Sequence, residues 1–312
     1  MELEIGAATR DAYGVALAEL GEKYPEIVVL DGDLAKSTRT YLFEEKFPER
    51  FYNTGIQEQN MVGIAAGLAA SGFVPFVSSF ACFLTARAYD QIRVSVAYAD
   101  LPVKFVASHG GISGGEDGVT QQSVEDFALM TAAPGMLVCS PADEHSTRAL
   151  VPQLMEIDSP CYMRTGRPNA PLVYDRDARF TLGKANVVSE GADVTVVANG
   201  LLVAEAIKAA EILADEGLEI EIIDCHTIKP LDAKTIVSSA RKTGAVVVAE
   251  EHQIWGGLGS AVARVLGQNY PVPCGFVALE DTFAESGPGY ELLEKYGLSA
   301  SAIVAEVKEV IS

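Results

Sequence analysis

The sequence has few basic residues: Lys and Arg number 23 against 43 Asp and Glu, which gives the 312-residue chain a formal net charge of −20. Nucleic acids and anionic membrane surfaces attract proteins through positive charge, so this balance argues against both as partners. A small anionic substrate is still compatible with the sequence, because a few local arginines can dominate the field inside one pocket.

The sequence also lacks any pattern typical of disulfides, of metal binding through cysteine, or of export. Its five cysteines form no CxxC pair and most lie in apolar runs, which is typical of buried free thiols in a reducing compartment. The N-terminus, MELEIGAATR, has no basic stretch followed by an apolar core, so we expect no signal peptide. No apolar run reaches the ~20 residues that a membrane span needs. We therefore expect a cytoplasmic protein.

What the sequence does contain is a regular alternation of apolar, β-branched runs with helical patterns. A chain of this length exceeds the usual single-domain size, so two domains are expected. The strand-like runs are apolar on both faces, which is typical of a covered parallel sheet. They cover residues 26–31, 73–79, 103–108, 136–141 and 161–165, and later 193–199, 219–225, 244–251 and 275–280. The alternation predicts an α/β fold with two doubly wound sheets.

One segment, 166–183, interrupts this alternation with two prolines, clustered charges and no periodicity. We interpret it as a linker between a domain over residues 1–175 and a smaller domain over residues 183–312. In the second domain, glycines open a predicted helix within residues 255–267, WGGLGSAVARVLG, where a phosphate could bind. The GxGxxG spacing of dinucleotide-binding folds is absent, so close backbone packing is the favoured interpretation.

Polar and aromatic side chains gather in the predicted loops that follow the strands of the first domain. Ligands of open parallel sheets bind beyond the carboxyl ends of the strands, so these residues mark a candidate site. They are Asp33, Ser37, Glu58, Phe80, Phe83, His109, Glu116, Asp117, Gln121 and Arg164. The glycine-rich loop 109–122 would let its backbone approach a ligand closely, although an ordinary flexible loop has the same composition. Core packing is the alternative interpretation for each phenylalanine.

Glu58 stands ahead of a helix-forming run of small apolar residues, MVGIAAGLAASG. An acid in the first turn of a helix is commonly solvated, and the helix dipole favours it there. A helix with so little side-chain bulk and no polar stripe is instead expected to be buried and closely packed, which would desolvate the acid. A desolvated carboxylate in a cleft is a candidate catalytic group.

Several motifs follow one another in order along the chain: AATRDAYG, GDLAKST, TGIQEQNM, SSFACFL, SHGGISGGEDGVTQQ, SPADEHS, YMRTGRP and DCHTIKPLD. Through this ordered set the chain resembles the pyrimidine-binding and C-terminal domains of transketolase, a thiamine-diphosphate enzyme. That family holds the cofactor's diphosphate and Mg²⁺ in a separate N-terminal domain, through a Gly-Asp-Gly motif followed by paired asparagines. LDGDLAKST is not that motif, and no Asn-Asn pair occurs in the sequence. The resemblance therefore implies an N-terminal partner subunit, active sites at the interface and an α2β2 heterotetramer.

The resemblance also implies roles for residues around the cofactor. Glu58 matches the glutamate that hydrogen-bonds the aminopyrimidine ring and favours its reactive tautomer, so that the protein controls the tautomer and the cofactor supplies the carbanion chemistry. Phe80 and Phe83 match aromatic residues that pack on the pyrimidine. Asp33 matches an aspartate beside the cofactor.

For the substrate, the resemblance implies a phosphate-binding cluster at the pocket entrance. Its members are Arg10, Ser37, His109 and Arg164. Arginine suits this role because its planar fork grips phosphate oxygens bidentately. Asp117 matches the aspartate that contacts a substrate hydroxyl, and with Glu58 and His109 it completes the implied catalytic set. Gln121 stands where the family usually has a histidine that faces the donor, and glutamine cannot titrate near neutral pH.

The implied reaction is transfer of a two-carbon ketol unit from a ketose phosphate to an aldose phosphate. Alternatives are the β subunit of a 2-oxo acid dehydrogenase, a protein similar to deoxyxylulose-phosphate synthase, and a transketolase paralog for an unusual ketose. Release of CO₂ from pyruvate would favour the first two alternatives. A binding module without activity is a further alternative, in which Glu58→Ala would change no activity.

Overall fold

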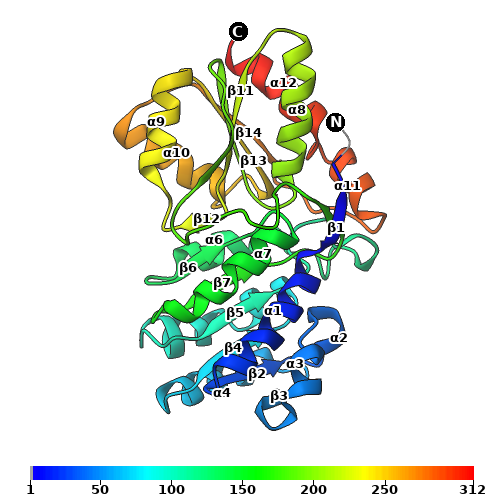
Figure 1. Ribbon diagram of the computed structural model, residues 1–312, viewed down its shortest axis with the longest axis vertical. Coiled ribbons are helices and arrows are strands. Elements are labelled where there is room, and N and C mark those ends of the chain that lie inside the picture. Colours follow the sequence, from blue (N-terminus) through cyan, green and yellow to red (C-terminus); the bar gives the residue numbers. More distant parts are fainter. Residues whose placement is uncertain (1–2) are drawn as a thin grey trace.

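The computed structural model describes residues 3–312 and places them in two stacked halves, each built on a largely parallel sheet (Figure 1). The seven-stranded sheet has the order β12-β6-β7-β5-β4-β2-β3, the five-stranded sheet the order β14-β13-β10-β11-β9, and β1 pairs with β8. The strands are β1 Ile5–Ala8, β2 Ile27–Asp31, β3 Phe51–Asn53, β4 Val74–Ser78, β5 Lys104–Ala107, β6 Leu137–Cys139, β7 Cys161–Arg164, β8 Asn169–Pro171, β9 Asn186–Ser189, β10 Val194–Ala198, β11 Ile220–Asp224, β12 Thr227–Lys229, β13 Val246–Gln253 and β14 Cys274–Leu279.

Helices cover both faces of the sheets; in the upper half, α9 and α10 lie on one face and α8 and α12 on the other (Figure 1). The α-helices are α1 Thr9–Lys23, α2 Ala35–Thr38, α3 Tyr41–Lys46, α4 Glu58–Ala70, α5 Tyr89–Gln91, α6 Asp126–Ala132, α7 Glu144–Leu150, α8 Leu202–Asp215, α9 Ala233–Thr243, α10 Leu258–Asn269, α11 Gly289–Lys295 and α12 Ala300–Val310. Short 3₁₀ turns are η1 Pro48–Arg50, η4 Gly115–Asp117 and η5 Pro152–Glu156, and π-helical turns are η2 Phe83–Arg87 and η3 Ile92–Ala97.

Local sequence explains where several of these helices begin and end. At the start of α7, Asp143 accepts a hydrogen bond from the Ser146 amide at 2.7 Å, and the Asp143 amide donates to the Ser146 hydroxyl at 2.9 Å. This reciprocal cap satisfies two amides that the helix itself leaves unpaired. Gly244 ends α9 at φ 77°, a left-handed conformation that glycine adopts without a Cβ clash.

The central strands confirm the predicted α/β class. All residues of β2, β5, β10 and β11 are buried, as parallel strands covered on both faces must be. One apolar cluster contains Phe105 of β5 together with Val197 of β10 and Val248 of β13, so the core continues from the first sheet into the second. The two halves therefore share buried apolar surface, which stabilises their relative placement.

Several short strands were not predicted, among them β8 and β12, and β12 joins the two halves. Within the segment interpreted as a linker, 166–183, strand β8 pairs antiparallel with β1, and Pro171 lies opposite Ile5. Strand β12 comes from the second half but pairs with β6 at the edge of the first sheet, with Thr227 opposite Cys139. Strands of three residues are too short to show a hydrophobic period, so the sequence pattern could not reveal them.

Helix α4 is buried on one side only, which corrects the expectation of close packing all round. Met61, Val62 and Ala65 are fully buried beneath it. On the opposite side a Cβ added at Gly63 or Gly67 would meet no atom within 4 Å. Small residues thus line the outer face of the helix, and the sequence pattern alone did not distinguish an exposed face of this kind from a packed one.

The structure bears on the remaining bulk expectations as well. All five cysteines are free thiols. Within residues 3–312, no helix is both long and apolar enough to cross a bilayer.

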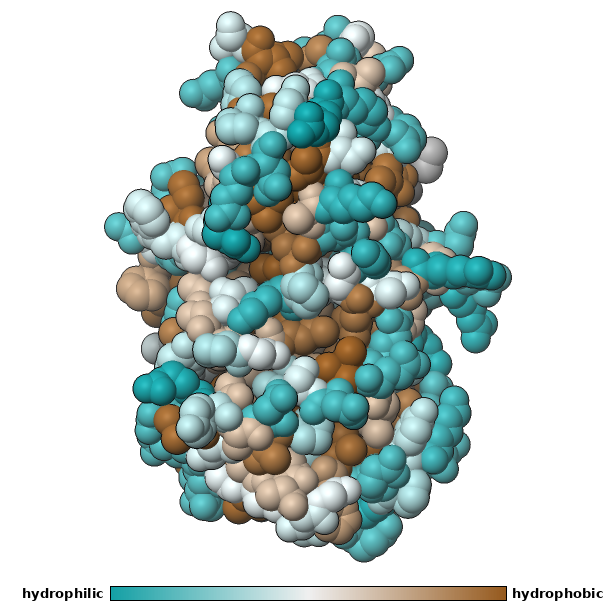
Figure 2. Space-filling model, turned by 90° about the vertical axis from the view of Figure 1, so that its left-hand side faces the viewer, coloured by the Kyte–Doolittle hydropathy of each residue, from teal (hydrophilic) through white to brown (hydrophobic). Residues whose placement is uncertain are grey.

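Figure 2 shows the face of the molecule on the α9 and α10 side, with apolar side chains exposed between polar ones across its middle. A cleft of about 740 Å³ is lined by α6, β12, α9 and α10. At its edge the Lys229 ammonium donates to the carbonyl oxygens of Thr131 at 2.8 Å and Ala133 at 2.5 Å. Lys229 therefore caps the carboxyl end of α6 and holds the halves together.

Candidate active site

The candidate site lies at the carboxyl edge of the seven-stranded sheet. Asp33 follows β2, Glu58 opens α4, Phe80 follows β4 and His109 follows β5. Parallel strands present their carboxyl ends at one edge, so the topology brings together residues that are far apart in the sequence. A single parallel bridge between Phe80 and Ser108 fixes two of these loops relative to each other.

Glu58 is a buried acid at the first position of α4, as expected, with only 3 % of its surface exposed. Its carboxylate accepts a hydrogen bond from the Ser79 hydroxyl at 3.3 Å. The Arg87 guanidinium lies 3.3 Å from both carboxylate oxygens, and the Arg87 side chain is itself 48 % exposed. The solvated first-turn acid is therefore the wrong alternative. On the side that faces solvent, the Glu58 carboxylate is covered by the half-exposed Arg87 side chain.

A row of stacked rings leads from Glu58 to His109. The Arg87 guanidinium lies over the Phe83 ring, 4.0 Å from its centroid. The rings of Phe83 and Phe80 stack at 5.6 Å, and those of Phe80 and His109 at 3.8 Å. Phe83 and Arg87 bound the π-helical turn η2, a local insertion that is common at functional sites. The structure thus brings the predicted acid and both predicted aromatics into one continuous surface.

A group of positive charges surrounds His109. Burial, together with the charges of Arg10, Arg167 and Arg39, lowers the pKa of His109 to about 3. Burial and the nearby charge of Arg39 also lower the pKa of Arg10. The Arg10 guanidinium donates to the carbonyl oxygen of Ser37 at 3.1 Å, which anchors it beside the predicted serine. We name the three arginines Arg10, Arg39 and Arg167, with the adjacent Ser37, the cationic group around His109.

His109 is neutral at physiological pH and is held in a fixed orientation. Its Nδ1 shares a hydrogen bond of 2.8 Å with the Ser108 hydroxyl, and its Nε2 lies 3.3 Å from the Asp117 carboxylate. A neutral imidazole has one N–H and one acceptor nitrogen, so the ring can hold or pass a single proton. The predicted pair of His109 and Asp117 is therefore adjacent in the structure.

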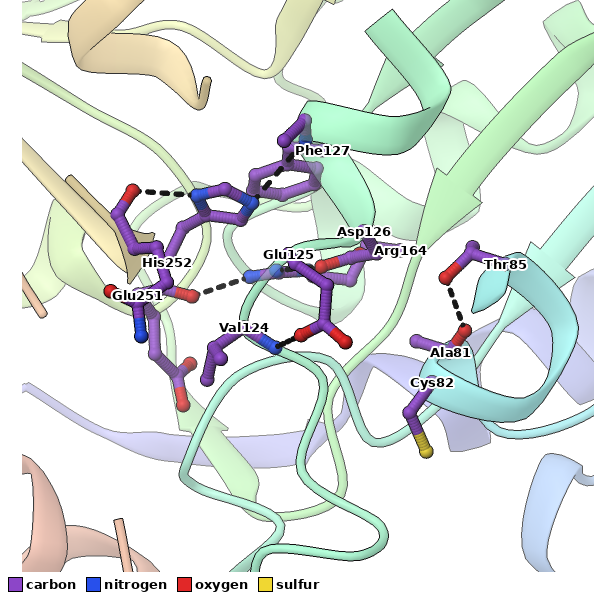
Figure 3. Close-up of polar contacts among 12 residues, drawn as sticks. Ala81, Cys82, Thr85, Val124, Glu125, Asp126, Phe127, Arg164, Glu251 and His252 are labelled. Atoms are coloured by element: carbon purple, nitrogen blue, oxygen red, sulfur yellow. Dashed lines mark hydrogen bonds and ion pairs between the residues drawn. The ribbon is translucent and has the colours of Figure 1, made fainter. Parts of the chain in front are cut away.

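Arg164 does not join the cationic group, although the sequence placed it there. Its guanidinium is buried, forms an ion pair with Asp126 and donates to the carbonyl oxygen of Glu251 at 2.7 Å (Figure 3). It also lies over the Phe127 ring, 3.7 Å from the centroid. Burial alone would lower the pKa of Arg164, but the Asp126 charge outweighs it and raises that pKa. Because its donors bind Asp126 and the Glu251 carbonyl, Arg164 contributes to the site by holding other residues in place.

Arg167, in place of Arg164, lies near His109 with the other arginines. Its Nη1 donates to the carbonyl oxygen of Gly114 at 3.1 Å, and its Nε lies 3.7 Å from Asp117. It also forms an ion pair with the exposed Glu116, and with 33 % of its side chain exposed it can reach a ligand by giving up that pair. The signal in the sequence was the second arginine of YMRTGRP, three residues beyond the strand end, where a side chain is no longer held within the sheet.

Backbone strain marks the same region. Five non-glycine residues among 3–312 have a positive φ, and three of them lie here: Asp33 at 67°, Arg39 at 69° and His109 at 62°. Left-handed conformations are costly for residues with a Cβ and cluster at active sites, where surrounding structure holds them. The strain supports a function for this edge of the sheet.

The two other predicted residues lie at the margins of the site. Asp33 is exposed and accepts a hydrogen bond from the Asn53 amide group at 3.0 Å. Gln121 is half-buried, and its backbone carbonyl oxygen accepts a hydrogen bond from the Cys82 thiol at 3.4 Å. This contact joins the loop 109–122 to the start of η2, which carries Phe83.

Comparison with known proteins identifies the family. Residues 6–173 match the model of the transketolase pyrimidine-binding domain, and residues 183–303 match that of the transketolase C-terminal domain. The chain belongs to the transketolase family. It is 45 % identical to a 6-deoxy-6-sulfo-D-fructose transketolase subunit of Clostridium sp. (strain MSTE9), over 96 % of this chain and 94 % of that subunit. It superposes with a TM-score of 0.89 on a split-gene transketolase described as an inactive beta4 tetramer, 49 % identical over 98 % of both chains.

This transketolase-family chain spans nearly all of one subunit relative but about half of a longer relative. It is 41 % identical to transketolase-like protein 2 of Mus musculus over 97 % of this chain but only 49 % of that protein. Within residues 3–312, no three His, Cys, Asp or Glu side chains converge as a metal site.

The glycine-opened helix of the second half has its N-terminus filled by the chain itself. The Glu250 carboxylate accepts hydrogen bonds from the amides of Leu258 and Gly259, both at 2.8 Å. An internal carboxylate thus takes the place that an external anion would occupy at the start of α10. The structure agrees with close packing there.

Proposed function

We propose that this chain, with an N-terminal partner subunit, transfers a two-carbon ketol unit from a ketose phosphate to an aldose phosphate. One observation carries the proposal: a buried acid, Glu58, is linked by a row of stacked rings to the cationic group around His109. This arrangement fits a reaction that needs an aromatic cofactor at one end and a phosphorylated sugar at the other.

The pyrimidine end of thiamine diphosphate fits the residues around Glu58. The cofactor would supply the carbanion chemistry that breaks and forms carbon–carbon bonds. The half-buried Phe83 would offer its face to a heteroaromatic ring, where offset contacts add ~0.5–1.5 kcal/mol beyond burial, and the buried Phe80 would support Phe83 from beneath. The buried carboxyl group of Glu58 would exchange a proton with a ring nitrogen, and Arg87 would have to leave both the carboxylate and the Phe83 ring. Asp33 is proposed to line the same space.

The diphosphate and Mg²⁺ are proposed to bind mainly to the partner. This inference is supported by the half-length match to single-chain transketolases. We propose an α2β2 heterotetramer, in which the side of Glu58 that Arg87 covers faces the partner subunit. A cytoplasmic location follows from the same composition that predicts free thiols.

The cationic group is proposed to bind the sugar phosphate. Arg10 and Arg167 would grip the phosphate oxygens, and neutral His109 would donate its N–H to the sugar. Asp117, which lies beside His109 and Arg167, would accept a hydrogen bond from a substrate hydroxyl. Gln121 is proposed to contact the donor without exchanging a proton with it.

A sulfonated ketose is a second candidate donor. The subunit from Clostridium sp. (strain MSTE9), 45 % identical to this chain, is named for 6-deoxy-6-sulfo-D-fructose. A sulfonate presents a tetrahedral set of anionic oxygens, as a phosphate does, so the same arginines could bind either group.

The proposal is tested by reconstitution. The chain is mixed with its N-terminal partner, thiamine diphosphate and Mg²⁺, and ketol transfer to an aldose phosphate is measured with xylulose 5-phosphate and with the sulfonated ketose as donors. We expect transfer without CO₂ release, and none from the chain alone. Full activity of the chain alone would refute the split-subunit proposal, and CO₂ release from pyruvate would favour the 2-oxo acid class.

A further inference from the structure

The loop that carries His109 and Asp117 is enclosed by the second half of the molecule. The Gln122 side chain donates to the carbonyl oxygen of Glu285 at 3.1 Å, and the Gln253 amide donates to the carbonyl oxygen of Val124 at 2.9 Å. A Cβ added at Gly115 would lie 3.0 Å from the carbonyl oxygen of Gly287. Residues 108–115 are all buried, which favours an ordered segment over the flexible-loop alternative.

One carboxylate of the second half contacts the loop directly. Glu251 of β13 is 6 % exposed, and its Oε1 accepts a hydrogen bond from the Ser113 amide at 2.5 Å. Gly111, at φ 84°, lies so close that an added Cβ would collide with the Glu251 carboxyl carbon. The loop backbone therefore rests against this carboxylate midway between His109 and Asp117.

The other side of the same loop is held by the buried ion pair. Arg164 packs against Gly110, where an added Cβ would collide with the Arg164 side chain. The same arginine is fixed by Asp126 and donates to the backbone oxygen of Glu251 at 2.7 Å (Figure 3). Glu251 thus takes part on both sides, through its carboxylate to the loop and through its carbonyl to the arginine beneath it.

We infer that Glu251 is a positioning residue for substrate binding: from the second half, it holds the loop 109–117 so that His109 and Asp117 face the sugar phosphate. The part of this inference that concerns the substrate rests on the proposed function. The part that concerns loop order does not. This positioning role would give the second half of the chain a direct contribution to a site whose side chains all come from the first half.

The neighbouring residue Glu250 provides a matched control. It lies on the same strand, is 1 % exposed, and accepts two backbone hydrogen bonds, but its side chain points to the opposite face of β13 and contacts α10. Glu250→Ala and Glu251→Ala remove equal side chains from equally buried positions. Only Glu251→Ala removes a side-chain contact with the loop 109–117.

Amide hydrogen exchange of the full-length chain tests loop order without any activity assay. Because a hydrogen bond to a charged group is lost, we expect Glu251→Ala to speed exchange of residues 110–118 about ten- to a hundredfold. Glu251→Gln keeps an acceptor oxygen and should restore most of the protection. Exchange in residues 194–198 reports whether each variant is folded, and Glu250→Ala should leave residues 110–118 at the wild-type rate. Equal exchange of the loop in both alanine variants would overturn the inference.

Steady-state kinetics of the reconstituted heteromer then test the consequence for the substrate. Glu251→Ala should raise KM for a phosphorylated donor about tenfold or more, with a smaller change in kcat, and Glu251→Gln should lie near wild type. Loss of kcat alone would overturn the substrate part of the inference. If the wild-type heteromer transfers no ketol unit while the exchange difference persists, the proposed function fails and the positioning role of Glu251 stands.

Discussion

The sharpest prediction separates two arginines that lie three residues apart. Arg167→Ala should weaken the binding of phosphorylated sugars and leave the fold intact, since its side chain is 33 % exposed and its contacts are with the loop 109–117. Arg164→Ala should instead destabilise the protein, because the Arg164 side chain is 6 % exposed and paired with a fully buried Asp126.

The magnitudes follow from these contacts. A charge-assisted hydrogen-bond pair to a phosphate contributes ~1.5–3 kcal/mol, so Arg167→Ala should raise KM for a phosphorylated donor about 10- to 100-fold. Removing one partner of a buried ion pair costs ~3–5 kcal/mol, because the remaining charge is left without compensation. Arg164→Ala should therefore lower the free energy of unfolding by about that amount.

The assay compares a phosphorylated with an unphosphorylated ketose donor in the reconstituted heteromer. For Arg167→Ala the ratio of the two kcat/KM values should fall toward one, while the urea midpoint stays close to that of wild type. Arg241→Ala is a control on α9, where that arginine lies over the Tyr270 ring, and should change neither quantity substantially. The reasoning is refuted if Arg164→Ala abolishes phosphate preference in a fully stable protein and Arg167→Ala does not.

Three further predictions concern the aromatic row and its ends. Glu58→Gln should lower kcat about 10²- to 10⁴-fold at saturating cofactor, since it removes an acid–base group, with little change in melting temperature; a rate near wild type would contradict its role. Phe83→Ala should raise the KM for thiamine diphosphate several-fold through loss of ~0.5–1.5 kcal/mol of ring contact, and Phe83→Tyr should not. His109, neutral when folded, takes up a proton on unfolding below its ordinary pKa of 6.5, so the free energy of unfolding should fall as the pH drops from 6.5 towards 3. Urea titrations of wild type and His109→Gln over this range should converge as the pH falls; parallel curves would exclude the effect.

Much of the fold was predictable because it depends on local pattern. Strands such as β2 and β10 are continuous apolar runs, and their alternation with helices leaves few topologies other than a doubly wound sheet. The carboxyl-edge rule then placed Glu58, Phe80 and His109 near one another before any distance was known. What escaped prediction was short or depended on a distant partner, as β8 and β12 did.

The site also combines features that local sequence predicts with features that depend on distant partners. The sequence could identify two arginines at the end of β7, but only the fold buries Arg164 against Asp126 and leaves Arg167 partly exposed, beside Glu116 and Asp117. Likewise, no pattern around Glu251 indicates that its carboxylate meets the amide of Ser113, 138 positions earlier.

By itself, the sequence determined the class of fold, the order of its motifs and the presence of an acid at the head of a helix of small residues. These features depend on the period of apolar side chains and on residue types at close spacing. Only the tertiary structure decided which charges are paired internally and which remain available to a ligand. Whether a charge is paired or available depends on the distance and burial of its partners. Those partners lie far apart in the sequence: 38 positions for Arg164 and Asp126, and 138 for Glu251 and the Ser113 amide.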